Sequence, residues 1–162
     1  MRILTFDIED WFHILDNKST SDEHTWNSFP SRINKNLDLI FDMLIRYNQK
    51  ATFFCLGWIA EKNPGIIKRI ISNGFEIGSH SYSHQLVYEQ NPDDFRRDLK
   101  KSIAILEDLS GQKIKYYRAP GFSIRRDCLW TFEILAEEGI GLDCSIFPAR
   151  RNHGGLPSFN TN

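Results

Sequence analysis

The sequence contains few cysteines and no strong excess of charge of either sign. Its three cysteines, Cys55, Cys128 and Cys144, include no Cys-x-x-Cys pair, so they predict no disulfide framework and favour a reducing, cytoplasmic location. The formal net charge of -1 gives no reason to expect nucleic acid or an anionic membrane as a partner. No segment approaches the roughly 20 apolar residues that a membrane span requires.

The length of 162 residues, with 41% hydrophobic and 25% charged residues, is typical of one globular domain. Short apolar runs that predict strands alternate with segments in which apolar residues recur every three or four positions, as in helices. We expect strands at 2–6, 51–56, 75–77, 113–117 and 140–145, and helices at 33–45, 64–71, 92–109 and 127–138, with Ser31 and Asn91 as N-caps and Gly57-Trp58 as a turn. This order predicts a parallel sheet whose functional residues lie at the carboxyl ends of the strands.

Two histidines, His80 and His84, follow the third predicted strand at a spacing of four residues. If the chain coils into a helical turn from Ser79 or His80 onward, both imidazoles project from one side and can share a cation. Two ordinary surface or core histidines are the alternative, because this spacing also arises by chance. A metal site therefore needs a third ligand from elsewhere in the chain.

Three carboxylates, Asp7, Glu9 and Asp10, follow the first predicted strand. Their mutual repulsion is normally offset by a cation or by a basic side chain, although a solvated strand end with one N-capping Asp would also account for them. A carboxylate with two imidazoles is a ligand set for a catalytic divalent ion, and a second carboxylate can act as a base. Arg118 follows the fourth strand, and we expect all these side chains to converge at one edge of the sheet.

The order of three motifs resembles that of the polysaccharide deacetylases, carbohydrate esterase family 4. The motifs are Thr5-Phe6-Asp7-Ile8-Glu9-Asp10, Ser79-His80-Ser81-Tyr82-Ser83-His84 and Arg118-Ala119-Pro120-Gly121, and the first is similar to the branch that reads Asp-x-Glu-Asp-Trp/Tyr-Phe. The resemblance implies an α/β fold, a distorted (β/α) barrel. It runs from about residue 1 to about residue 157, so we expect residues 1–162 to form one catalytic domain truncated after about five βα units, without the C-terminal part of the barrel.

The resemblance also implies roles for individual residues. Asp7 matches the general base, Arg118 the arginine that orients it, and His80 and His84 the metal-binding histidines. The acidic ligand is left open between Glu9, which shares a side of an extended strand with Asp7, and Asp10, which needs a turn to join them. The expected ion is Zn²⁺, with Co²⁺, Ni²⁺ or Mn²⁺ as alternatives.

Two of these assignments have plainer alternatives. Arg118 could form only a surface salt bridge. Pro120 and Gly121 match the position where the family offers a backbone N–H to the oxyanion or substrate, but this glycine could serve only to make the turn. The polar segment from Asp16 to Ser28 predicts a long loop that lines the site, and we expect neither His13 nor His24 to be a ligand.

The implied activity is metal-dependent removal of N-acetyl groups from the sugars of a polysaccharide or glycan precursor. No Leu-x-His motif supplies a general acid here, and open barrel edges would need the rest of the protein or an oligomer to cover them. We therefore expect metal binding to be retained more readily than turnover. The alternatives are a related amidohydrolase acting on a cyclic ureide or imide, a non-catalytic glycan-binding module that stacks sugars on Trp11, Phe12, Tyr82 or Phe122, and a metal-free α/β scaffold.

Overall fold

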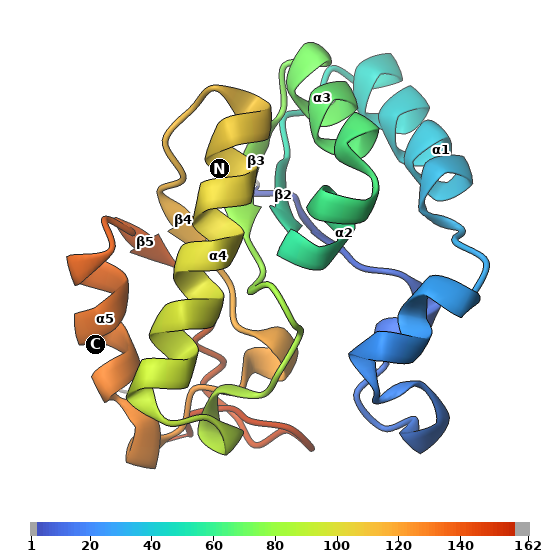
Figure 1. Cartoon of the computed structure of the whole chain (residues 1–162). Helices are drawn as coiled ribbons and strands as arrows, with labels where there is room; N and C mark the ends of the chain where they lie inside the picture. The colour runs from blue at the N-terminus through green and yellow to red at the C-terminus, as the bar shows by residue number, and fades with distance from the viewer. Residues whose placement is uncertain (1–2, 158–162) are drawn as a thin grey trace.

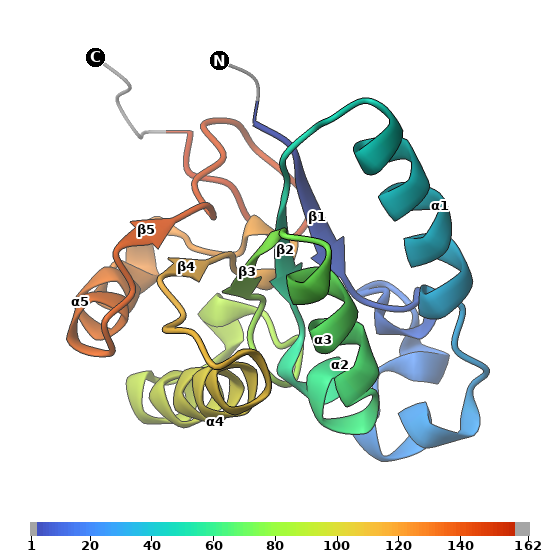
Figure 2. The same cartoon turned by 90° about the horizontal axis from the view of Figure 1, so that it is seen from above.

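A computed structural model describes residues 3–157, and its centre is a five-stranded parallel sheet (Figures 1 and 2). The strands follow one another in spatial order as they do in sequence: β1 (Thr5–Ile8), β2 (Thr52–Cys55), β3 (Glu76–Ser79), β4 (Tyr116–Tyr117) and β5 (Leu142–Asp143). The predicted alternation of strands and helices is confirmed. Arg2, where the first strand was expected to begin, and the last five residues of the tail lie outside the described residues.

Helices cover the outer side of the sheet in an arc (Figure 2). They are α1 (Ile33–Arg46), α2 (Gly57–Lys62), α3 (Pro64–Ser72), α4 (Pro92–Ser110) and α5 (Trp130–Glu137). The longest, α4, begins as the sequence predicts: the Asn91 side chain accepts the Asp94 N–H at 2.9 Å, and Pro92 occupies the first turn. It ends at Gly111, whose φ of 67° is the left-handed conformation that favours glycine. No helix among these residues is long and apolar enough to cross a bilayer.

The core lies between the sheet and its helices, where the apolar faces predicted from periodicity meet. Phe53 of β2, Leu37 of α1, Ile67 of α3 and Leu99 of α4 are all fully buried, at 0–1% exposure. β2 has a neighbour on both sides and contributes only apolar residues and Cys55 to the buried set. The helices therefore hold the sheet from one side and leave the carboxyl ends of its strands for polar side chains.

Strand register brings the predicted motifs to one edge. β1 pairs with β2 so that Asp7 lies opposite Phe54, and β2 pairs with β3 so that Cys55 lies opposite Ser79. Ser79 in turn lies opposite Tyr117 of β4. Since all pairs are parallel, the residues that follow β1, β3 and β4 emerge at the same end of the sheet.

The structure differs from the predicted elements at several boundaries. Gly57 and Trp58 begin α2 instead of making a turn, because their N–H groups donate to the loop after β3, where a helix N-terminus has free donors. Ser31 is not the cap of α1: Arg32 takes that position and has no side-chain cap. The fourth and fifth strands are shorter than expected, and the last helix starts at Trp130 after a short 3₁₀ segment at Arg126–Cys128.

We predict that Gly78→Ala destabilises the chain, because a Cβ at Gly78 would lie 2.8 Å from Phe54 Cδ1 and 2.9 Å from Tyr116 Cβ. The free energy of unfolding, measured by urea denaturation, should fall by about 1–3 kcal/mol, the usual cost of overpacking. Gly65→Ala is the matched control because no atom lies within 4 Å of its added Cβ, and it should leave stability unchanged or slightly higher. Equal stability of Gly78→Ala and the parent would contradict the packing.

Candidate metal centre

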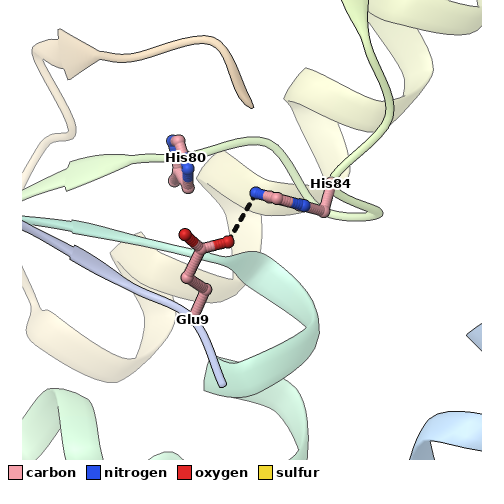
Figure 3. Close-up of side chains that lie close together, drawn as sticks. All are labelled: Glu9, His80 and His84. Atoms are coloured by element: carbon pink, nitrogen blue, oxygen red, sulfur yellow. Dashed lines mark ion pairs between the residues drawn. The ribbon is translucent and has the colours of Figure 1, made fainter. Parts of the chain in front are cut away.

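Glu9, His80 and His84 form a compact cluster at the carboxyl end of the sheet. One ligand atom from each lies within 4.8 Å of the other two, and Glu9 Oε2 is 2.7 Å from His84 Nε2 (Figure 3). Glu9 follows β1 and the histidines follow β3, so the cluster spans the end of β2. Both imidazoles are buried, whereas the Glu9 side chain is 36% exposed. The arrangement is a carboxylate facing two imidazoles, with one side open to solvent.

The segment that carries the two histidines is an irregular loop, so the helical turn considered for it is absent. Ser81 has φ 65° and His84 has φ 57°, left-handed values that residues other than glycine rarely adopt. His84 N–H donates to Ser81 Oγ at 3.0 Å. The loop, and not helical periodicity, turns His84 back toward His80.

A backbone carbonyl sets the orientation of His80. His80 Nδ1 lies 2.8 Å from Arg118 O, and a carbonyl can only accept, so Nδ1 carries the proton. Nε2 of the neutral ring is then left with a lone pair. Metal-binding histidines commonly donate their second N–H to a carbonyl in this way, so the donor set fits a divalent ion.

Arg118 also holds Asp7, as the sequence predicted. Its Nη1 lies 2.7 Å from Asp7 Oδ1, its Nη2 donates to Thr5 Oγ1 at 2.9 Å, and its guanidinium stacks on the Phe54 ring at 4.2 Å. The Arg118 side chain is only 12% exposed, so the reading as a surface salt bridge is wrong. The ion pair fixes the Asp7 carboxylate in position beside the cluster.

The electrostatics of the cluster favour the protonation states that bind cations. Burial by itself would raise the pKa of Glu9, but the hydrogen bond with His84 and the nearby histidines lower it below its usual value. Burial also lowers the pKa of His80, against the opposing effect of Asp7 and Glu9. At neutral pH the carboxylate is therefore ionised and the His80 imidazole is neutral, as metal ligands must be.

The Asp10 carboxylate, unlike that of Glu9, forms hydrogen bonds with backbone N–H groups within residues 3–157. It is buried and accepts the N–H groups of Trp11 at 2.9 Å and Arg32 at 3.0 Å, which joins the start of the long loop to the start of α1. Glu9 lies with the two histidines and Asp10 lies outside their cluster, so the geometry favours Glu9 over Asp10 as the acidic ligand.

The predicted oxyanion segment is a tight turn. Gly121 has φ 61°, and a Cβ there would lie 2.9 Å from Leu15 Cδ1 and 3.0 Å from His153 Cβ. The positive φ and the lack of space for a Cβ both require glycine at position 121 for the turn itself, without any role in catalysis. A role for Pro120 and Gly121 toward the oxyanion or substrate stays a prediction.

A cavity of about 270 Å³ lies beside His84, and the long loop lines it as expected. Its walls include His13, Trp26, Tyr88 and Glu89. His13, which the sequence did not single out, is buried: only 3% of it is exposed, and its Nδ1 accepts the Asp10 N–H at 2.8 Å. The aromatic residues around it (Phe12, Trp26, Trp58) were the only sequence signal of this burial.

Burial of His13 predicts a pH-dependent stability in metal-free protein. Burial, with a smaller contribution from His84, lowers the pKa of His13 to about 4 from an ordinary 6.5. Between these values the unfolded chain binds the proton and the folded chain does not, so stability falls as pH drops from 6.5 toward 4. Titration of His13 should lower the free energy of unfolding by about 3 kcal/mol between pH 6.5 and pH 4.

The matched variant is His13→Asn, which keeps an acceptor for the Asp10 N–H but cannot titrate. Urea unfolding of both proteins with chelator present should show a smaller loss of stability between pH 7 and pH 4 in His13→Asn than in the parent. Parallel pH profiles for the two proteins would contradict the burial of a neutral His13.

Comparison with known proteins relates this chain to a family. Residues 13–136 match the sequence profile of the polysaccharide deacetylases. A peptidoglycan-N-acetylglucosamine deacetylase of Bacillus cereus is 42% identical over 95 residues, which are 58% of this chain and 34% of that protein. The chain thus spans about a third of that relative.

Solved structures share the fold. A structure described as a polysaccharide deacetylase from Mycobacterium smegmatis superimposes with a TM-score of 0.75 at 23% identity, over 95% of this chain and 56% of that one. A carbohydrate esterase family 4 pseudoenzyme from Bacillus anthracis superimposes with a TM-score of 0.67 at 23% identity, over 87% and 41%. On the profile match, which covers most of its length, this chain belongs to the polysaccharide deacetylase family.

Proposed function

We propose that the protein is a metal-dependent hydrolase that removes N-acetyl groups from sugar residues of a polysaccharide or glycan precursor. The observation that carries the proposal is the Glu9–His80–His84 cluster with the Arg118-bound Asp7 carboxylate beside it. Membership of the polysaccharide deacetylase family supports it, as does the 42% identity to a protein named as a peptidoglycan-N-acetylglucosamine deacetylase. The substrate class is an N-acetylated glycan.

The residues divide the work between binding and proton transfer. Glu9, His80 and His84 would hold the ion, which we propose to be Zn²⁺, with Co²⁺, Ni²⁺ or Mn²⁺ as substitutes. When bound, such an ion acts as a Lewis acid that polarises a carbonyl and makes water a better nucleophile. Asp7 takes the proton of the water that attacks the acetamide carbonyl, and Arg118 holds the Asp7 carboxylate in place during this step. Cleavage of the amide C–N bond gives acetate and the free amino sugar.

We assign no general acid within this chain. The sequence has no Leu-x-His motif, and the one histidine after His84 is His153, whose Nε2 lies 3.0 Å from Asp16 Oδ1. The leaving amine therefore has no designated proton donor among these residues. This supports the expectation that metal binding is retained more readily than turnover. A cytoplasmic location and an oligomer that covers the sheet edges also stay predictions.

Two other functions use the same fold. A non-catalytic glycan-binding module is favoured by the structural likeness to a pseudoenzyme. Against it, Phe12 and Tyr82 are buried at 2% and 7% exposure, which leaves Trp11 and Phe122 as the half-buried aromatic residues for stacking on sugars. An amidohydrolase for a cyclic ureide or imide is the second alternative, and substrate tests separate it from a deacetylase.

The first test is metal binding by the purified chain. We expect about one Zn²⁺ per chain by elemental analysis after dialysis. In His80→Ala the affinity for Zn²⁺ should fall by about 100-fold or more, because changes to residues that only support the ligands already lower it by ~10–100-fold. His24→Ala removes an exposed histidine and is the matched control. Equal zinc content in the parent and His80→Ala would remove the ligand assignment.

The second test is acetate release from N-acetylated glycan oligomers with added Zn²⁺. We expect Asp7→Asn to lower the rate by about 10²–10⁴-fold, the usual contribution of a general base, while zinc binding stays at the parental level. If the parent releases no acetate and Asp7→Asn keeps full glycan affinity, the binding-module function is correct instead. Ring opening of a cyclic imide without acetate release would favour the amidohydrolase.

A further inference from the structure

The loop from His80 to His84 has an unusual backbone that the rest of the fold must hold in place. Two of its residues, Ser81 and His84, have left-handed φ values although neither is glycine. Such conformations persist when surrounding contacts over-determine them. Groups outside the loop must therefore form hydrogen bonds with its backbone N–H and C=O groups.

Two consecutive N–H groups of the loop donate to one carboxylate, that of Asp98 in α4. Tyr82 N–H donates to Asp98 Oδ2 at 2.7 Å and Ser83 N–H to Asp98 Oδ1 at 2.9 Å. Ser83 Oγ also donates to Oδ1, at 2.5 Å. Asp98 forms no ion pair with any residue in the range 3–157, so these loop groups are its polar partners there.

The carbonyl groups of the same loop are held from the other side by α2. Gly57 N–H donates to Ser81 O at 2.8 Å and Trp58 N–H to Tyr82 O at 3.2 Å. The approach is so close that a Cβ on Gly57 would lie 2.9 Å from Tyr82 Cδ2. The first turn of α2 supplies donors, and Asp98 supplies acceptors. Between them the loop between the two histidines is fixed from both sides.

We propose that Asp98 is a positioning residue for the metal centre: through Tyr82 and Ser83 it holds the loop in the one conformation that sets His84 against His80 and Glu9. The inference rests on the proposed metal-dependent function and adds to it a residue that touches neither ion nor substrate. A carboxylate is required because it offers two acceptor oxygens to two parallel N–H donors. Asn has a single acceptor oxygen and would turn an NH₂ group toward a donor.

The test compares Asp98→Asn with Asp108→Asn, which makes the same charge change on an exposed position of the same helix. Zinc affinity is measured by competition with a chelating dye, well below the unfolding temperature. We expect Asp98→Asn to bind Zn²⁺ about 10–100-fold more weakly, the usual cost of losing a group that orients a ligand. Saturating Co²⁺ should show a shifted visible spectrum in Asp98→Asn, which a general loss of stability would not cause. Asp108→Asn should match the parent in both.

Hydrogen exchange of metal-free protein separates this inference from the proposed function. In Asp98→Asn we expect the amides of Tyr82 and Ser83 to exchange at least about tenfold faster, because one acceptor oxygen cannot hold both N–H groups and the loop opens more often, while β3 stays protected. If the parent binds no zinc, the proposed metal function fails, and faster exchange still identifies Asp98 as the loop anchor. Parental zinc affinity in Asp98→Asn would overturn the inference whatever the exchange rates are, and so would parental exchange of both amides. If Asp98→Asn does not fold, Ser83→Ala must show the same two effects at smaller size, and parental values there overturn it.

Discussion

Arg118 is the residue on which the geometry of the site depends, because it makes two connections at once. Its guanidinium holds Asp7, which belongs to β1, and its backbone carbonyl accepts the Nδ1 proton of His80, which follows β3. The Asp7 carboxylate and the His80 imidazole are thus both held by a single residue, which directly follows β4. A guanidinium at 12% exposure is stabilised by its contacts with Asp7, Thr5, the Cys144 carbonyl and the Phe54 ring. Movement of β4 relative to β1 would therefore disturb the carboxylate and the imidazole together.

The site combines regular and irregular backbone for different purposes. Parallel strands fix where Asp7, Ser79 and Arg118 lie, since their spacing is set by interstrand hydrogen bonds. The final direction of His84 cannot come from a strand, because consecutive strand residues point to opposite faces. It comes from left-handed backbone in the loop after β3, which two helices stabilise through hydrogen bonds to its peptide groups. The strands set the spacing of Asp7, Ser79 and Arg118, and the loop after β3 sets the direction of the His84 side chain.

The sequence was informative where a local pattern has one physical meaning. The apolar periodicity and the Asn91 cap located α4, and the order of the motifs predicted that Asp7, His80 and Arg118 lie at one edge of the sheet. It was ambiguous where the answer depends on a turn: Glu9 and Asp10 are adjacent carboxylates, and only the hydrogen bonds from Trp11 and Arg32 decide which one turns away. Asp98 carried no signal, since a charged residue in a helix is usually a solvated one and its partners lie 15 and 16 residues earlier.

The chain distance between Asp7 and Arg118 has a consequence for how the molecule comes to its native state. The two residues are 111 positions apart, and the contact joins the first strand to the fourth. Closing so long a segment has a high entropic cost that local helices do not face. The Asp7–Arg118 ion pair can therefore form only after β1 and the end of β4 have come together. During synthesis, Asp7 leaves the ribosome long before Arg118 has been made, so the ion pair between them cannot form until the segment through β4 is available.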